Sequence, residues 1–273
     1  LAVTNGGTFA EDTMFTAGTL ATPTKDGAIF DGWYANDDFT GEKVTSASNG
    51  ETYYAKWIGM DDMELQYAGT QQITVSENIS LSDYKSSDSS VATVDSSGNV
   101  TATGVGTATI SATGTYNGQQ AIFEATVTVI PRVLTYTNTD GSAGSGSITY
   151  NYSGGHHALS DSLTFQWKDS PNTAVELEEG TDINYTYTVP KTDETPDGGT
   201  ALTYDYLPMP VGTYSNVKFN LLNENYTFGL SDGSTRDYLE IDVNVVAEGS
   251  QRAYLASAAP KADQNFVYTG EGV

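Results

Sequence analysis

The stretch Phe30-Asp31-Gly32-Trp33-Tyr34, followed after a polar segment by Thr52-Tyr53-Tyr54-Ala55-Lys56-Trp57, carries the most specific pattern of the sequence. Aromatic residues favour strands, whereas the intervening Asn49-Gly50 favours a turn. Working outward, Asp26-Gly27 marks another turn just before the first aromatic run. The pattern therefore predicts short strands joined by polar turns.

The residues of this pattern stand at the spacing of a known bacterial module. They are Pro23, Gly27, Phe30, Gly32-Trp33-Tyr34 and Tyr54-Ala55-Lys56-Trp57. Residues 1–59 resemble the Listeria–Bacteroides repeat, the B-repeat type of module described in internalins, although residues 1–5 match its opening strand poorly. The resemblance implies a small β-grasp-like fold, in which Trp33 and Trp57 are mainly core residues. It also implies a modular protein on the outer surface of a bacterium.

Residues 60–130 carry a second pattern, in which short apolar runs alternate with turns. Residues 89–95 alternate as a strand, residues 96–99 (Ser-Ser-Gly-Asn) give a tight turn, and residues 106–112 alternate again. The spaced aliphatic residues that predict one core between two stacked sheets are Val91, Val94, Val100, Val105 and Ile110. Residues 89–113 resemble the group 2 bacterial immunoglobulin-like domain, which implies a β-sandwich for residues 60–130.

Residues 131–247 predict a larger immunoglobulin-like sandwich without a specific family. Its expected strands lie at 133–136, 147–152, 163–167, 183–189, 217–221 and 238–245, and residues 170–181 and 191–200 are expected to be exposed loops. We interpret residues 248–273 as a linker or the start of a further module. The predicted fold class is therefore all-β, with a β-grasp-like repeat followed by two sandwiches in an extended string.

Composition narrows the possible functions of the chain. Its 273 residues contain 35 acidic and 11 basic residues, a net charge of −24, and no cysteine. Such an acidic chain repels phosphate backbones and anionic membranes, which argues against nucleic-acid binding. The absence of cysteine excludes disulfides and thiolate ligands. No apolar run approaches the ~20 residues that a membrane-spanning helix requires. We expect a fragment of a longer exported protein, monomeric and without membrane insertion.

Candidate metal ligands are present but poorly spaced. Calcium requires six to eight oxygen ligands, more than the acidic pairs Asp37-Asp38 and Asp61-Asp62 supply by themselves. A denser acidic group comprises Glu176, Glu178, Glu179 and Asp182. A structural Ca²⁺ is therefore an open alternative to solvated carboxylates, and we expect no other cofactor. The neighbouring His156 and His157 would point to opposite faces of a strand, which favours an exposed turn over a metal site.

No catalytic motif stands out, so we expect a non-catalytic protein. A nucleophile elbow is absent, since residues 144–146 (Gly-Ser-Gly) lie in a Gly/Ser loop. With 35 acidic residues, any pair of glycosidase carboxylates would be arbitrary. Gram-positive sandwiches can carry internal Lys–Asn isopeptide bonds, for which the candidates are Lys168 and Lys218 with Asn220 or Asn244.

Aromatic residues crowd residues 131–247 and leave two functions open. They are Trp167, Tyr185, Tyr187, Tyr204, Tyr206 and Tyr214. Core packing is the simpler interpretation, and we then expect a stalk or adhesion fragment of a bacterial cell-surface or secreted protein, with a protein or glycan ligand. The alternative is a carbohydrate-binding accessory region of an extracellular glycan-degrading enzyme, which an exposed, coplanar aromatic platform would favour. A hydrolase domain in residues 131–247 would instead require a concave site with two facing carboxylates.

Overall fold

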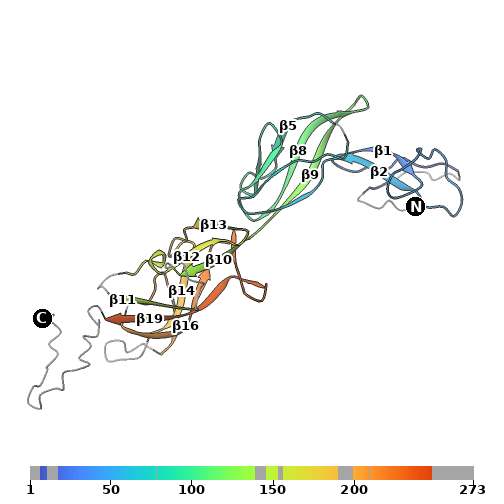
Figure 1. Ribbon diagram of the computed structural model, residues 1–273. Helices are drawn as coiled ribbons and strands as arrows, with labels where there is room; N and C mark the ends of the chain where they lie inside the picture. The colour runs from blue at the N-terminus through green and yellow to red at the C-terminus, as the bar shows by residue number, and fades with distance from the viewer. Residues whose placement is uncertain are drawn as a thin grey trace, which may run out of the picture. The chain divides into compact units, whose positions relative to one another are not determined.

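The protein is all-β, as the sequence predicts (Figure 1). The computed structural model describes residues 7–10, 18–77, 79–138, 146–152, 156–189, 199–208 and 210–247, and the predicted linker at 248–273 lies outside them. The described residues form strands β1 to β19 and one short 3-10 helix, η1 (Leu159–Asp161), and none of their helices is long and apolar enough to cross a membrane. The chain divides into unit 1, Leu1–Val133 with Glu224–Thr227, and unit 2, Leu134–Asn223 with Phe228–Val273.

The aromatic stretch forms an antiparallel pair, β1 (Ala28–Tyr34) and β2 (Tyr54–Gly59). Phe30 lies opposite Trp57 and Gly32 lies opposite Lys56, so Asp31 is the extra residue of a β-bulge. The Phe30 ring packs edge-on against both Trp33 and Trp57, with centroid distances of 5.5 Å in each case. Trp33 is buried and Trp57 half-buried. A β-grasp-like fold would contain more strands than the two of this sheet. That fold therefore stays a prediction for residues 1–59.

The next seven strands form a sandwich of two sheets, which agrees with the predicted immunoglobulin-like domain. They are β3 (Met63–Gln66), β4 (Thr70–Gln72), β5 (Leu81–Ser86), β6 (Ala92–Val94), β7 (Asn99–Ala102), β8 (Gly106–Tyr116) and β9 (Gln119–Ile130). One sheet has the order β3-β9-β8-β5 and the other β4-β7-β6. Of the predicted core residues, Val91, Val100 and Ile110 are buried, whereas Val94 and Val105 are half-buried.

The strand expected at residues 89–95 is shorter than predicted, because a turn occupies its first half. The carboxylate of Asp88 accepts hydrogen bonds from the Ser90 amide (2.9 Å) and hydroxyl (2.6 Å). The Asp88 carbonyl accepts from the amides of Val91 and Ala92. These local bonds compete with strand pairing, so β6 begins only at Ala92.

The β1–β2 sheet and the sandwich share one hydrophobic core. Ile29 of β1 and Ile58 of β2 are register partners, with 6% and 0% exposure, and they pack into the same buried cluster as Ile110 and Val127 of the sandwich. A backbone hydrogen bond from the Glu124 amide to the Gly27 carbonyl (3.1 Å) adds a direct link to β9. The β1–β2 sheet and the sandwich therefore pack together within unit 1.

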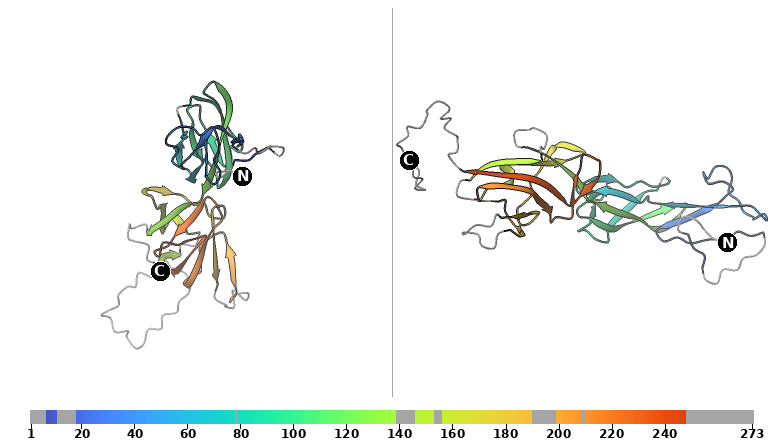
Figure 2. Two further views of the ribbon diagram at one scale, coloured as in Figure 1. Left: turned by 90° about the vertical axis from the view of Figure 1, so that its right-hand side faces the viewer. Right: turned by 90° about the horizontal axis from the view of Figure 1, so that it is seen from below.

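Two five-stranded sheets lie within residues 132–247. Their strands are β10 (Arg132–Asn138), β11 (Ser147–Tyr152), β12 (Leu163–Trp167), β13 (Ser170–Val175), β14 (Ile183–Thr188), β15 (Ala201–Tyr204), β16 (Gly212–Leu221), β17 (Tyr226–Gly229), β18 (Thr235–Arg236) and β19 (Tyr238–Ala247). Most of these residues belong to unit 2, but the division above places the first two residues of β10 and of β17 in unit 1. The sheet orders are β13-β12-β10-β17-β18 and β11-β19-β16-β14-β15, and Figure 2 shows these strands in two further views.

The loop expected at residues 170–181 is wrong in its first half, which forms β13. Pro171 and Asn172 are poor strand formers and suggest a loop. As an edge strand β13 needs pairing on one side only, and its neighbour β12 supplies it, with Phe165 opposite Val175. Most of the loop expected at residues 191–200 lies outside the described residues.

Gly27 tests the attachment of the β1–β2 sheet to the sandwich. Its φ is +72°, and a Cβ there would lie 2.5 Å from Glu124 Cβ and 3.0 Å from the Glu124 backbone nitrogen. Gly50 has a similar φ of +87° with nothing within 4 Å, so it is the matched control. We expect Gly50→Ala to cost about 1–2 kcal/mol through backbone strain. Gly27→Ala should cost a further ~1–3 kcal/mol through the clash.

Urea unfolding in a Trp167→Phe background measures this difference, because only Trp33 and Trp57 then report by fluorescence. Equal losses of stability for the two alanine variants would contradict the close approach of Gly27 to β9.

Candidate functional site

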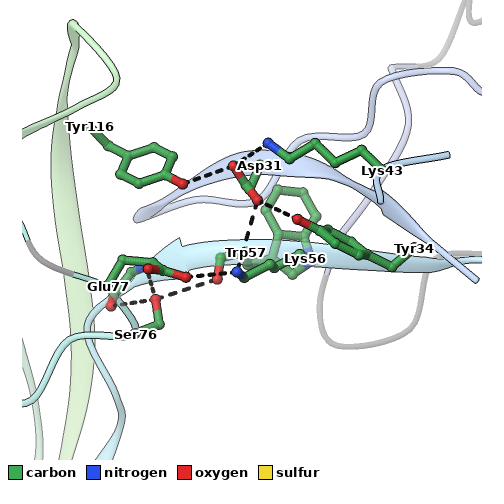
Figure 3. Close-up of polar contacts among 9 residues, drawn as sticks. Asp31, Tyr34, Lys43, Lys56, Trp57, Ser76, Glu77 and Tyr116 are labelled. Atoms are coloured by element: carbon green, nitrogen blue, oxygen red, sulfur yellow. Dashed lines mark hydrogen bonds and ion pairs between the residues drawn. The ribbon is translucent and has the colours of Figure 1, made fainter. Parts of the chain in front are cut away.

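A buried carboxylate lies where β1 meets the sandwich of unit 1 (Figure 3). The Asp31 side chain is only 3% exposed. It accepts hydrogen bonds from Lys43 Nζ (2.7 Å), Tyr116 Oη (2.9 Å) and Tyr34 Oη (3.0 Å), and Lys56 Nζ lies 4.0 Å away. Tyr116 ends β8 and so belongs to the sandwich, whereas the other donors come from residues 34–56. The bulge at Asp31 thus directs one carboxylate to donors from both parts of unit 1.

The donors around Asp31 keep its carboxylate charged. Burial alone would raise the pKa of Asp31, but the hydrogen bonds from Lys43, Tyr116 and Tyr34 together outweigh it and lower the pKa. The hydrogen bond to Asp31 raises the pKa of Lys43 in return. Burial and the bond to Asp31 raise the pKa of Tyr116, so its hydroxyl stays a donor.

A second polar contact lies beside the first and joins the same two parts of the unit. Lys56 Nζ on β2 lies 2.7 Å from Glu77 Oε1 in the loop after β4. The Gly59 amide donates to Ser76 Oγ (3.1 Å), and the Ser76 amide donates to the Gly59 carbonyl (3.1 Å). No local pattern of the sequence predicts this site, because Asp31, Glu77 and Tyr116 are far apart in the chain and an isolated aspartate is usually exposed.

Unit 2 contains a different cluster, centred on Glu179. Tyr185 Oη donates to Glu179 Oε1 (2.8 Å), and the Leu159 amide donates to Oε2 (3.4 Å). His156 Nε2 lies 3.8 Å from the same Oε2, and the two side chains are 46% and 14% exposed, respectively. A buried tyrosine thus positions a carboxylate that also faces the surface histidine.

The two histidines lie outside any strand and make different contacts. His157 stacks on Tyr150 with a centroid distance of 3.8 Å and an interplanar angle of 5°, and its Nε2 lies 2.8 Å from Ser162 Oγ. Only His156 is exposed, so the exposed turn expected for both is wrong for the half-buried His157. Burial lowers the pKa of His157 despite the nearby carboxylates of Asp161 and Glu179.

The tyrosines of unit 2 form a chain of ring contacts from the core to the surface. Tyr187 packs edge-on against Tyr214 (5.7 Å) and stacks on Tyr204 (4.3 Å, 22°). Tyr204 then contacts Tyr206 (5.8 Å, 48°), which meets His156 edge-on (5.9 Å). Tyr187 is 5% exposed and Tyr206 is 37% exposed. The rings of Tyr204 and Tyr206 are tilted by 48° to each other, so these two residues do not form a coplanar aromatic platform.

The acidic group predicted from the sequence lines a groove of about 730 Å³ in unit 2. Glu176, Glu178, Glu179 and Asp182 share its wall with apolar residues that include Leu159 and Phe165. The inner carboxylates already have protein partners. Asp182 accepts from the Glu178 amide (3.0 Å) and from Asn223 Nδ2 (2.7 Å). Glu179 accepts from Tyr185 Oη and from the Leu159 amide. Two of the four acidic side chains of the groove are therefore held by protein donors.

A structural Ca²⁺ stays a prediction from sequence, and the acidic pairs named for it make contacts with the protein. Within the described ranges, no group of three or more His, Asp or Glu residues is arranged to hold a metal ion. Asp61 Oδ2 accepts from Thr74 Oγ1 (2.7 Å), and Asp62 Oδ1 accepts from the Thr126 amide (2.6 Å). Asp38 accepts from both the amide and the hydroxyl of Thr40, which lowers its pKa.

The residues considered for an isopeptide bond make other contacts. Lys218 Nζ lies over the Tyr238 ring, 4.7 Å from its centroid. Asn220 Nδ2 donates to Asn184 Oδ1 and Thr186 Oγ1, both at 3.0 Å. Lys168 is exposed. An isopeptide bond between these residues stays a prediction from sequence.

Asp31 predicts an acid-dependent loss of stability in unit 1. Because folding lowers its pKa, its contribution is complete above the unfolded value of about 3.9 and is lost as the pH falls through the folded value. We expect Asp31→Asn to destabilise unit 1 by roughly 2–3 kcal/mol at pH 7. The difference from the unsubstituted protein should shrink below about pH 4.

Urea unfolding at a series of pH values measures the effect, with the exposed Asp37→Asn as the charge-matched control. A difference that stays constant from pH 7 to pH 3 would show that the Asp31 carboxylate does not act through its charge.

His157 predicts a separate pH dependence for unit 2. Its folded pKa is lowered, so its contribution is complete above the unfolded value of about 6.5 and falls as the pH drops through the folded value. Calorimetry should show the transition of unit 2 moving to lower temperature between pH 7.5 and pH 5. Asp31 lies in unit 1, so the thermal transition that Asp31→Asn leaves unchanged is assigned to unit 2.

His157→Phe keeps a ring against Tyr150 and should remove most of this pH dependence. If the variant retained the full shift, another group in unit 2 would be responsible.

Comparison with known proteins identifies one domain type. The family model of the intimin immunoglobulin-like domain matches residues 80–115, the segment from just before β5 to the penultimate residue of β8. This match supports a bacterial immunoglobulin-like domain within the sandwich of unit 1. A comparison with curated proteins finds no match.

Three solved structures are distantly similar to this chain. A SusE-like surface-located polysaccharide-binding protein from the heparin utilisation locus of Bacteroides thetaiotaomicron is 14% identical, with 70% of this chain and 33% of that chain covered and a TM-score of 0.22. This chain thus spans about a third of that protein. SGBP-B of the Bacteroides ovatus mixed-linkage glucan utilisation locus, in complex with a mixed-linkage heptasaccharide, is 14% identical (90% and 68% covered, TM-score 0.19). A titin segment, A168–A169, is 11% identical (69% and 96% covered, TM-score 0.25). Similarities this weak carry no argument about ligands.

Proposed function

We propose that the chain is a non-catalytic segment of a bacterial cell-surface or secreted protein, in which it holds and presents neighbouring modules. The observation that carries the proposal is the joint between residues 7–59 and the sandwich of unit 1. Ile29 and Ile58 belong to the sandwich core, and the buried Asp31 draws donors from both sides. A flexible connection would need neither a shared core nor a shared buried charge.

The chemistry of the side chains favours a non-catalytic role. A general acid or base must be free to exchange a proton with a substrate. Among the described carboxylates, Asp31, Glu179 and Asp182 each accept two or more hydrogen bonds from protein donors. These bonds stabilise structure and leave the three carboxylates poorly suited to proton transfer.

An extracellular location is part of the same proposal. The immunoglobulin-like match supports it, and so does the surface charge, because a net charge of −24 keeps an exposed protein soluble and monomeric. A protein or glycan ligand at the cell surface fits this role. Adhesion would then depend on exposed side chains that contact the ligand.

Spin labels test whether the joint is rigid. The chain has no cysteine, so Ser46→Cys and Ser96→Cys place labels on exposed residues on the two sides of the joint. Double electron–electron resonance should give one narrow distance distribution, because the shared core fixes the two sides. Asp31→Asn should broaden it, and Asp37→Asn, which lacks the buried contacts, should leave it unchanged. A broad distribution in the doubly labelled protein without further substitutions would argue against a rigid presenting role.

A further inference from the structure

The surface end of the tyrosine chain in unit 2 has the features of a small ligand site. Tyr206 is 37% exposed, and the His156 side chain is 46% exposed. Their rings meet edge-on at 5.9 Å, and Glu179 Oε2 lies 3.8 Å from His156 Nε2. An aromatic ring, an imidazole and a carboxylate therefore lie together at one exposed position. We name these three residues, Tyr206, His156 and Glu179, the Tyr206 cluster.

Buried side chains hold two residues of the Tyr206 cluster in place, which favours ligand binding. Tyr206 contacts Tyr204, which stacks on the buried Tyr187. Glu179 is fixed by the fully buried Tyr185 through a 2.8 Å hydrogen bond. Side chains fixed before binding lose less entropy when a ligand arrives. Mobile surface aromatics would lack this advantage.

We propose that the Tyr206 cluster binds one neutral pyranose unit of a polysaccharide. The C–H groups of a pyranose carry slight positive charge and pack on the negative face of an aromatic ring. His156 and Glu179 provide the hydrogen-bonding partners that neighbouring sugar hydroxyls require.

Charge and size narrow the class of ligand. The chain carries a net charge of −24, and the cluster itself contains the Glu179 carboxylate without Lys or Arg. Sulfated or uronic sugars would be repelled, which leaves neutral sugars. A protein interface buries ~800 Å² on each partner, far more than two partly exposed rings offer. One sugar ring matches the exposed area better, and this inference does not depend on the rigidity of the joint in unit 1.

Affinity electrophoresis tests the proposal with the whole chain. Native gels would contain, separately, dextran, galactomannan, xyloglucan or the anionic polygalacturonate. We expect retardation in at least one neutral gel and none in polygalacturonate. Tyr206→Ala should raise the dissociation constant for the neutral polysaccharide about tenfold, because the variant lacks the aromatic ring on which the sugar packs. Tyr206→Phe keeps the ring face and should retain most of the retardation.

Tyr152→Ala is the matched control, because Tyr152 is 39% exposed on β11 and makes no ring contact with the described residues of the cluster. It should migrate like the unsubstituted protein. Unretarded migration in all neutral gels, equal weakening by Tyr206→Ala and Tyr152→Ala, or equal retardation in polygalacturonate would each overturn the proposal. Unchanged melting temperatures for the variants would show that the fold is intact.

Discussion

The burial of the Asp31 carboxylate is the constraint on which the arrangement of unit 1 depends. A carboxylate that is 3% exposed is costly unless several donors satisfy it. Here Tyr34 and Lys43 come from one side and Tyr116 from the other, so the charge is satisfied only when both parts are in place. The hydrophobic core stabilises unit 1 through buried apolar area, which does not depend on direction. The Asp31 carboxylate also fixes how the two parts are oriented, because its hydrogen-bond donors must lie in particular directions.

The β-bulge connects this constraint to the sequence. In a regular strand the side chains alternate between the two faces of the sheet. The extra residue between Phe30 and Gly32 reverses this alternation for the residues that follow it. Ile29 and Phe30 precede the bulge and point to opposite faces by ordinary alternation, so Ile29 joins the sandwich core while Phe30 packs on Trp57. After the extra residue, the Trp33 ring also packs against Phe30. Gly32 leaves room for the Lys43 side chain beside the bulge, because a Cβ at residue 32 would lie 2.9 Å from that side chain.

Local sequence signals predicted the strands well where the pattern was periodic and the turns were marked. The strands at 147–152 and 163–167 have the predicted bounds, and Gly98 (φ +81°) occupies the expected turn before β7. β13 was missed because its pairing with β12 overrides its poor local propensity. The polar clusters were missed for another reason. Glu179 meets His156 and Asp31 meets Tyr116 only after folding, and no local pattern records such partners.

The direction of two strands has a mechanical consequence. β3 and β9, the first and last strands of the sandwich in unit 1, run parallel, with Met63 opposite Val127 and Gln66 opposite Ile130. Tension that enters at the start of β3 and leaves at the end of β9 pulls the strands past each other lengthwise. Evenly spaced hydrogen bonds between parallel strands then bear the load together. An antiparallel pair of terminal strands would instead be unzipped one bond at a time, so this topology suits a domain that is stretched between two attachment points.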